Sequence, residues 1–403
     1  MWLTTAALLF WQAANPASEG LKALEESRYE AAVQAFTKAI EADPADYSAH
    51  FNLGLAYSFL EKDSEGIAEY RKTLELKPGL YQAELNAGIL LVRQKKPGEA
   101  LTLLADAASQ KPAEYRPRYY LAEAQLANGN AAQAAESYHA ALASDAKSAA
   151  AELGLGRALA QQGNLPDAAS HFRKAAELDP KYRDSLLELA ALYEKGGQKT
   201  EALEIYKQFP GNAAVEERMG ELLLDSKQYA EAIPRLENAY SQSPTEANRV
   251  GLAMAYLFNQ QLDKAVPLLD QAVTQSPGNF NMRIMYAHAL RDQKRYPQAA
   301  RQFQEALKLQ PNAGHTWDEL GGVLYMAEDF QPALAAFERA HELGENLAGN
   351  WFMRAIILDK LHQLKPAVDA YQQFLSMSHD QSPDQEFQAR QRVRIIQREL
   401  EKR

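Results

Sequence analysis

The hydrophobic and polar positions of the chain follow one short pattern that returns many times. The stretch "FRKAAELDP" at residues 172–180 recurs with small changes at 36–44, 70–78 and 303–311. The proline that ends this stretch recurs at an interval of 34 residues over much of the chain. A period of this length is typical of solenoids, in which one small structural unit is stacked many times.

The second half of each unit carries small and large side chains at helical spacing. Twelve residues before the proline position the side chain is always small, and eight before it stands Phe, Tyr or Leu. In the unit that ends at Pro180 these residues are Ala168 and Phe172, and Ala175 follows. Offsets of four and three residues lie on one helical face, where small residues let a neighbouring helix approach and the large residue fills the gap. The pattern therefore predicts a closely packed helix.

The first half of each unit predicts another helix. Gly or Ala stands where a second close approach is needed, as at Gly54 and Gly156, and Tyr or Leu follows three residues later in most units. Turn signals such as "NGN" (128–130) and "QGN" (162–164) separate the two halves and interrupt the helical period. Each unit is thus predicted to be a helix, a turn, a second helix and a turn.

These positions resemble the tetratricopeptide repeat, whose pattern runs Trp, Leu, Gly, Tyr and then Ala, Phe, Ala, Pro. In the second unit, "HFNLGLAYSFLEKDSEGIAEYRKTLELKP", the motif positions hold Leu53, Gly54, Tyr57, Gly66, Tyr70 and Pro78. The resemblance implies an all-α fold, a right-handed α-α superhelix of helix-turn-helix repeats. We count eleven units: 13–46, 47–80, 81–114, 115–148, 149–182, 183–212, 213–245, 246–279, 280–313, 314–347 and 348–381.

The sixth unit and the end of the chain suggest how the array is organised. Pro210 arrives four residues early, so the second helix of the sixth unit should be short. We expect a change of superhelix direction there, which divides the array into repeats 1–5 (13–182) and 6–11 (183–381). The alternative is a deletion that the stack tolerates by local repacking. Residues 382–403 have an apolar stripe and predict a helix that caps the last repeat. The alternative is a basic tail that docks on an acidic partner or a membrane.

The first residues, 1–14, carry no charged side chain and are apolar over roughly the length of a signal-peptide core. They predict a signal peptide or an apolar N-terminal anchor, and hence an exported protein, periplasmic or secreted. Any membrane association is expected through this segment only. The alternative is a cytoplasmic protein in which the segment forms an apolar capping helix.

Composition narrows the possible functions. The formal net charge of −10 argues against nucleic acid as a partner, because phosphate binding requires neutralising Lys and Arg contacts. The chain has no cysteine, and its eight histidines show no metal-ligand spacing, so neither a metal nor a cofactor is expected. No nucleophile and base stand together in a recognisable motif, and the whole chain is taken up by repeats. We therefore expect no catalytic residues and no enzyme activity.

The resemblance also implies where a partner would bind. In the family, ligands usually lie along the concave groove lined by the first helix of each repeat. Carried over residue by residue, the candidate groove residues are Phe51, Asn52, Leu55, Phe59, Asn86, Ile89, Tyr119, Tyr120, Glu188, Glu221, Met254, Phe258, Ile284, Met285, His288, Tyr325 and Phe352.

The leading hypothesis is a non-catalytic interaction scaffold that binds a peptide or helical segment of a partner protein in this groove. The alternative is a structural subunit of a cell-envelope assembly that uses its convex face or its ends. Several questions stay open at this point: the partner, the pathway, the oligomeric state, the groove residues that carry binding, whether the N-terminal segment is cleaved, and whether the short repeat is a hinge.

Overall fold

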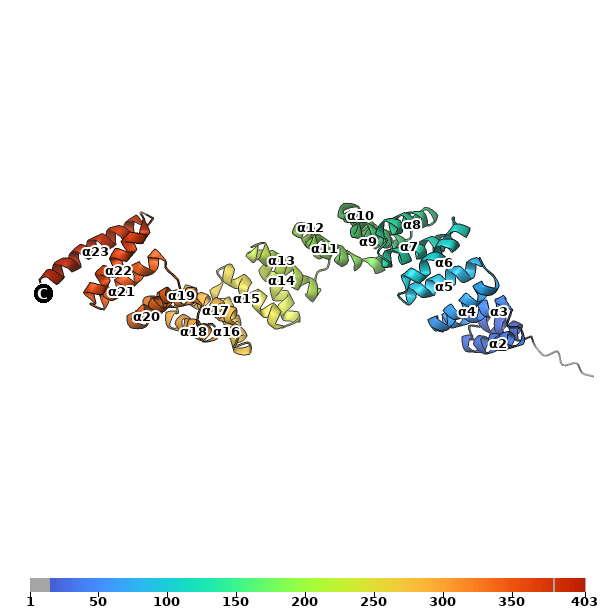
Figure 1. Ribbon diagram of the computed structural model, residues 1–403, viewed down its shortest axis with the longest axis horizontal. Helices are drawn as coiled ribbons and strands as arrows, with labels where there is room; N and C mark the ends of the chain where they lie inside the picture. The colour runs from blue at the N-terminus through green and yellow to red at the C-terminus, as the bar shows by residue number, and fades with distance from the viewer. Residues whose placement is uncertain (1–14, 380, 403) are drawn as a thin grey trace, which may run out of the picture. The chain divides into compact units, whose positions relative to one another are not determined.

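The protein, shown as a computed structural model in Figure 1, is described over residues 15–379 and 381–402. These residues form helices and turns, with no strand among them, which confirms the predicted all-α fold. The chain divides into two compact units, the first ending at Ile205 and the second beginning at Tyr206. This boundary falls inside the sixth repeat, near its end, whereas the predicted division lay before that repeat, after residue 182.

Every predicted repeat supplies two helices in the described part of the chain, and successive helices pack against each other up to residue 195 in the first unit and from residue 213 onward in the second. The first unit contains α1 (Pro16–Glu25), α2 (Tyr29–Ala42), α3 (Tyr47–Phe59), α4 (Asp63–Leu76), α5 (Tyr81–Arg93), α6 (Pro97–Gln110), α7 (Tyr115–Ala127), α8 (Ala131–Ser144), α9 (Ala149–Gln161), α10 (Leu165–Leu178), the 3-10 helix η1 (Pro180–Tyr182), α11 (Ser185–Lys195) and α12 (Lys199–Tyr206), which ends at the boundary.

The second unit continues the same alternation of helices. It contains α13 (Ala213–Asp225), α14 (Tyr229–Gln242), α15 (Glu246–Phe258), α16 (Leu262–Gln275), α17 (Phe280–Asp292), α18 (Tyr296–Leu309), α19 (Gly314–Met326), α20 (Phe330–Glu342), α21 (Ala348–Lys360), α22 (Leu364–Ser378) and α23 (Pro383–Glu401).

The two helices of one repeat meet where a glycine faces a large side chain. A Cβ atom added to Gly54 would lie 3.0 Å from the ring of Tyr70, and one added to Gly88 would lie 2.5 Å from Leu104. A side chain at either glycine would force the facing residue to shift, so the predicted close-contact position is confirmed. The same contact is made by Gly20 and Phe36, Gly156 and Phe172, Gly220 and Leu236, and Gly321 and Phe337.

The turn between the two helices also repeats its conformation. One residue per turn has a positive φ, and it is Gly at three of the turns and a residue with a side chain at the others. The predicted glycine turns at 128–130 and 162–164 are among them. The residues with positive φ are Ser27, Glu61, Lys95, Gly129, Gly163, Gly197, Lys227, Gln260, Lys294, Glu328 and His362.

Charged or polar side chains occupy a buried position in several first helices, where the family pattern has Trp. Each is held by a polar side chain of a second helix. Glu152 lies 2.6 Å from His171 Nδ1 and 2.5 Å from Lys174 Nζ, although it is only 1% exposed. Removing the partners of such a buried charge costs about 3–5 kcal/mol. The buried residues at this position are His50, Glu84, Glu152, Glu216 and Arg249.

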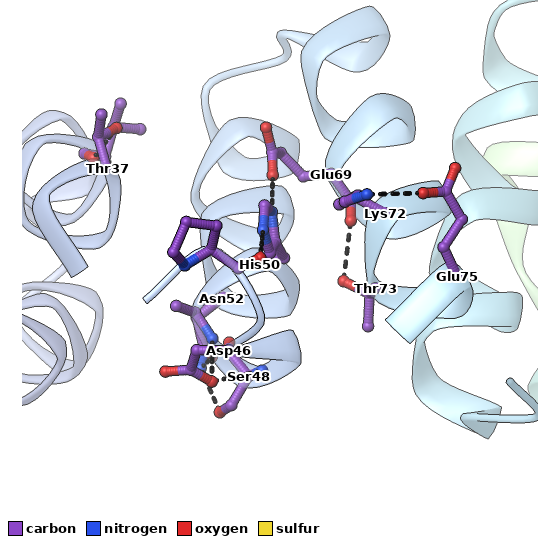
Figure 2. A network of polar contacts seen from close by, with 12 residues as sticks. Thr37, Asp46, Ser48, His50, Asn52, Glu69, Lys72, Thr73 and Glu75 are labelled. Carbon is purple, nitrogen blue, oxygen red and sulfur yellow. Dashed lines mark hydrogen bonds and ion pairs between the residues drawn. The ribbon is translucent and has the colours of Figure 1, made fainter. Parts of the chain in front are cut away.

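Figure 2 shows this arrangement around His50 in the second repeat. Its Nδ1 atom lies 2.6 Å from Glu69 Oε2, and its Nε2 atom lies 3.3 Å from the carbonyl oxygen of Pro44. Below it, Asp46 caps α3 by accepting hydrogen bonds from the backbone N–H groups of Ser48 and Ala49. These contacts tie the start of α3 to both the preceding turn and α4.

The sixth repeat is short, as predicted. Its second helix, α12, has 8 residues, whereas α10 in the fifth repeat has 14. Whether the superhelix changes direction here stays a prediction.

The helix α23 lies where the sequence predicted a capping helix, and it packs against α22. Ala389 and Ile396 are fully buried, and Arg392 makes an ion pair of 2.6 Å with Asp359 of α21. Its outer side is not purely polar, because Phe387 is 63% exposed and Ile395 is 49% exposed.

No helix in the described part of the chain is both long enough and apolar enough to cross a bilayer. The predicted signal peptide or anchor at 1–14 lies outside the described residues.

Candidate functional site

The first helices of neighbouring repeats form two pockets, one in each compact unit. The first pocket has a volume of about 580 Å³ and is formed by α3, α4, α5 and the start of α7. Apolar and aromatic side chains make up most of its wall. Its lining residues are Phe51, Leu55, Ser58, Phe59, Tyr70, Tyr81, Gln82, Leu85, Asn86, Ile89, Leu90, Arg93, Glu114 and Arg116.

The polar groups beneath the first pocket are hydrogen-bonded to one another. The Tyr70 hydroxyl lies 3.0 Å from Ser58 Oγ and accepts a hydrogen bond of 3.4 Å from the Asn86 amide. Ser58 also donates to the carbonyl oxygen of Gly54 at 2.8 Å. Burial raises the pKa of Tyr70, so the hydroxyl stays neutral. These polar groups at the floor of the pocket therefore have hydrogen-bond partners without a ligand.

Arg93 and Glu114 at the rim of the first pocket are paired within the chain. Arg93 forms an ion pair with Asp63 of α4, with Nε 2.6 Å from Oδ2. Tyr81 donates a hydrogen bond of 2.6 Å to Glu114, and burial together with this bond raises the pKa of Tyr81 to about 12. Phe59 is 53% exposed and stacks on Tyr29 with ring centroids 4.7 Å apart. An exposed aromatic ring therefore lies at this rim.

The second pocket has a volume of about 560 Å³ and is formed mainly by α19 and α21. It too has apolar walls, but carboxylates lie among them. Its lining residues are Arg291, Asp318, Glu319, Gly322, Val323, Tyr325, Met326, Phe337, Gly349, Asn350, Phe352, Met353 and Gln385.

The two neighbouring acidic residues of the second pocket differ in their environment. Burial opposes ionisation of Glu319, but the hydrogen bond from His288 at 2.6 Å and nearby positive charge hold its pKa below the usual range. Burial raises the pKa of Asp318, and the charges of Glu345 and Glu319 add to the increase. His315 and the Asn350 amide act in the opposite direction. Asp318 is thus the less easily ionised of the two.

The predicted groove residues are only partly brought together. Phe51, Leu55, Phe59, Asn86 and Ile89 converge on the first pocket, and Tyr325 and Phe352 line the second.

Two of the predicted residues have other roles. Asn52 donates a hydrogen bond of 2.9 Å to the carbonyl oxygen of Ser48 in its own helix and does not line the pocket beside Asn86. Phe352 was expected to face a partner, but it is only 6% exposed and packs against Phe374 at 4.9 Å. Its main contribution is to the interior, because the eleventh repeat places a second aromatic residue beneath it.

The tyrosines of the fourth repeat form an aromatic cluster. Tyr119 stacks on Tyr115 at 5.3 Å and meets the edges of Tyr120 at 5.2 Å and Tyr138 at 6.1 Å. Burial raises the pKa of Tyr119 above its usual value. This cluster joins neither of the two pockets.

The predicted acidic residues of the middle repeats are engaged within the chain. Glu188 makes an ion pair of 2.7 Å with Arg157, and Glu221 makes one of 2.6 Å with Arg218. The remaining predicted residues of the second unit are Met254, Ile284 and Met285, which are half-buried, Phe258, which is 45% exposed, and His288, which pairs with Glu319.

Sequence analysis missed Asp318 and Asn350 in the second pocket. Asp318 stands at the same position of its repeat as Phe51 does in the second repeat. Repeat position was therefore a signal that would have found it, because Phe51 itself was among the predicted groove residues. In the described part of the chain, no group of three or more His, Asp or Glu side chains is arranged to hold a metal ion.

Several solved structures are similar to this chain over less than half of its length. A structure of MamA from residue 41 onward from Desulfovibrio magneticus RS-1 has 22% identity and a TM-score of 0.39, covering 41% of this chain and 94% of its own. A structure of MamA AMB-1 has 25% identity and a TM-score of 0.39, covering 41% and 96%. YrrB, described as a TPR protein with an unusual peptide-binding site, has 21% identity and a TM-score of 0.40, covering 42% and 87%. No curated protein matches the chain.

Sequence profiles described as tetratricopeptide repeat or TPR repeat match the chain in many places and together cover more than half of it. The matched residues are 20–58, 47–79, 85–149, 119–183, 153–214, 223–270 and 259–318. They coincide with the paired helices and with the contacts between glycine and large side chains described above. The chain belongs to the tetratricopeptide repeat family.

Proposed function

We propose that the protein is a non-catalytic scaffold that binds a peptide or helical segment of a partner protein in the first pocket. The observation that carries this proposal is the convergence of residues from separate repeats on one apolar hollow. Phe51 and Phe59 come from α3, and Asn86 and Ile89 come from α5. Its volume of about 580 Å³ lies in the range of pockets that hold ligands.

The chemistry of the first pocket suits an apolar segment. Its exposed aromatic ring, Phe59, offers apolar area that a partner side chain would cover, and aromatic residues are enriched among the anchors of protein interfaces. The polar groups below it are already paired, so an apolar ligand leaves no donor or acceptor newly unsatisfied. An amphipathic helix laid along a groove uses anchors of this kind.

The hydrogen bonds and ion pairs among the polar groups of the first pocket support a binding role over a catalytic one. Catalysis by a side chain requires an activated nucleophile or a poised acid or base within reach of a substrate. Tyr70 and Tyr81 both have raised pKa values, which keeps their hydroxyls neutral, and Arg93 is held by Asp63.

The proposal can be tested by affinity capture from native extract, read by mass spectrometry. Two variants are compared with the unaltered chain: Phe59→Glu in the first pocket, and Leu178→Glu as a matched control. Leu178 is also an exposed apolar residue of the first unit, 36% exposed, but it ends a second helix.

We expect a small set of proteins that the chain and the control retain and that Phe59→Glu loses while remaining folded. If all three forms retain the same set, the first pocket is not the binding site. Binding through the ends or the second helices, as expected for a structural subunit, would then be the better explanation.

We also propose that the protein is exported, on the basis of the uncharged apolar segment at 1–14. Mass determination of the protein purified from its native source tests this. A mature chain that lacks these residues supports cleavage of a signal peptide, and an intact chain in the cytoplasmic fraction contradicts export.

A further inference from the structure

Two residues that line the second pocket each have a polar atom without a hydrogen bond of ordinary geometry. Asp318 Oδ1 and Asn350 Nδ2 are both buried, and neither completes a hydrogen bond of ordinary geometry. The Asn350 amide is nevertheless close enough to lower the pKa of Asp318. Asn350 is only 7% exposed and lines the pocket. A buried polar group without a partner is costly, so a native structure that retains two of them together calls for an explanation.

The charges around the pocket single out Asp318. Its neighbour Glu319 is paired with His288 at 2.6 Å and lies 3.8 Å from Arg291. Among the described residues, Asp318 makes no ion pair; His315 favours its ionised form, and the carboxylates Glu345 and Glu319 oppose it. The local excess of negative charge favours a cationic group and disfavours an acidic or phosphorylated one.

The walls of the pocket suit the rest of a protein segment. Tyr325, Met326 and Met353 surround the opening with apolar and thioether groups, and methionine adapts readily to different partner shapes. The backbone at Gly322 and Gly349 faces open space, because a Cβ atom added to either would meet nothing within 4 Å.

We propose that the second pocket binds a lysine or arginine side chain carried by an otherwise apolar protein segment. The cationic group lies against Asp318, and the aliphatic part of the same side chain lies along Tyr325 and Met353. This arrangement gives the Asp318 carboxylate a counter-charge and covers the apolar wall. The proposal is independent of what the first pocket binds.

A peptide selection with the full chain tests the proposal. A displayed library of random peptides is selected on the protein, and the most enriched sequence is synthesised with a fluorescent label. We expect it to contain a basic residue beside bulky apolar residues. The decisive comparison replaces that basic residue with norleucine or citrulline, which keeps the length of the side chain but removes its charge. The neutral peptide should bind about tenfold more weakly or worse.

Two variants locate the binding. Asp318→Asn should reduce affinity for the basic peptide about tenfold while leaving affinity for the neutral peptide nearly unchanged. Gly322→Trp should fill the pocket and abolish binding of both peptides. Its matched control is Gly278→Trp, since a Cβ atom at Gly278 also meets nothing within 4 Å but Gly278 lies outside the pocket.

The outcomes separate this proposal from the proposed function. If Phe59→Glu abolishes binding and Gly322→Trp does not, the peptide belongs to the first pocket, and the assignment of the second is wrong. Failure to enrich any peptide, enrichment of peptides without a basic residue, or equal binding of a simple alkylamine would also overturn it.

Discussion

The two pockets are built on the same repeat but differ in the polar groups that they contain. Their volumes are nearly equal, about 580 Å³ and 560 Å³. Beneath the first, the hydroxyl of Tyr70 and the amide of Asn86 bond to each other. In the second, Asp318 and Asn350 each keep an atom without a partner.

The comparison shows that the packing beneath the two pockets is alike while the surface above it differs. Gly54 meets Tyr70 beneath the first pocket, and Gly321 meets Phe337 beneath the second, so the scaffold is the same in both places. The residue at the surface position above differs, Phe51 in one repeat and Asp318 in the other. Chemistry can therefore change from repeat to repeat without a change in the helix contacts.

The largest predicted effect tests whether the two scaffolds are equivalent. Tyr70 and Phe337 are 0% and 2% exposed, so Tyr70→Ala and Phe337→Ala should each lower the free energy of unfolding by about 3–5 kcal/mol. Urea denaturation followed by circular dichroism measures both. A cost below about 1 kcal/mol for either variant would contradict the equivalence of the two interiors.

Two adjacent glycines face different surroundings, Gly321 the interior and Gly322 the pocket. A Cβ atom at Gly321 would lie 2.9 Å from the Phe337 ring, whereas one at Gly322 would meet nothing. Gly321→Ala should destabilise the protein, because overpacking costs about 1–3 kcal/mol and outweighs the gain in helix propensity. Gly322→Ala should stabilise it by up to about 1 kcal/mol. Denaturation midpoints of the two variants should therefore move in opposite directions from that of the unaltered chain.

The unpartnered carboxyl group predicts a pH dependence in the acid range. Burial raises the pKa of Asp318 in the folded state. The stability that this side chain contributes is therefore present below its unfolded pKa of about 3.9 and is lost as the pH rises through its folded pKa. Asp318→Asn should therefore be more stable than the unaltered chain at neutral pH, and the difference should shrink in acid. Urea midpoints between pH 4 and 8 measure it, and an Asn variant that is less stable at neutral pH would argue against an unpaired Asp318.

The first pocket predicts the corresponding effect in the alkaline range. The pKa of Tyr81 is raised to about 12 by burial and by its bond to Glu114. Its contribution to stability is present below the unfolded pKa of about 10 and is lost as the pH rises toward 12. As the pH rises from about 10 to about 12, Tyr81→Phe should therefore lose less stability than the unaltered chain. Asp318→Asn is the control, because it should lose as much stability in this alkaline range as the unaltered chain does.

Sequence reasoning was most successful where the chain repeats itself. The helix pairs, the close contact of Gly54 with Tyr70, the glycine turns and the short α12 follow from residues that recur at one period. Each of these contacts is local to one repeat or to its neighbour, so the pattern in sequence maps directly onto a pattern in space.

The residues of the candidate site were predicted less well. Phe51, Phe59 and Asn86 converge as expected, but Phe352 is buried and Asp318 was overlooked. The reason is that the family pattern states which positions face the groove but not which side chains bond to one another. The bond from Asn52 back to Ser48 and the ion pair of Glu188 with Arg157 depend on the rotamers of individual side chains.

The central claim is that the surface formed by the first helices binds a partner protein. Site-specific photo-crosslinking tests it most directly, with p-benzoylphenylalanine placed at Phe59 in the full chain and at Leu178 as the control, in the native cell. Both residues are exposed and belong to the first unit. The account predicts that illumination joins one discrete partner to the chain from Phe59 and none from Leu178. A crosslinked partner from Leu178 with none from Phe59 would contradict it.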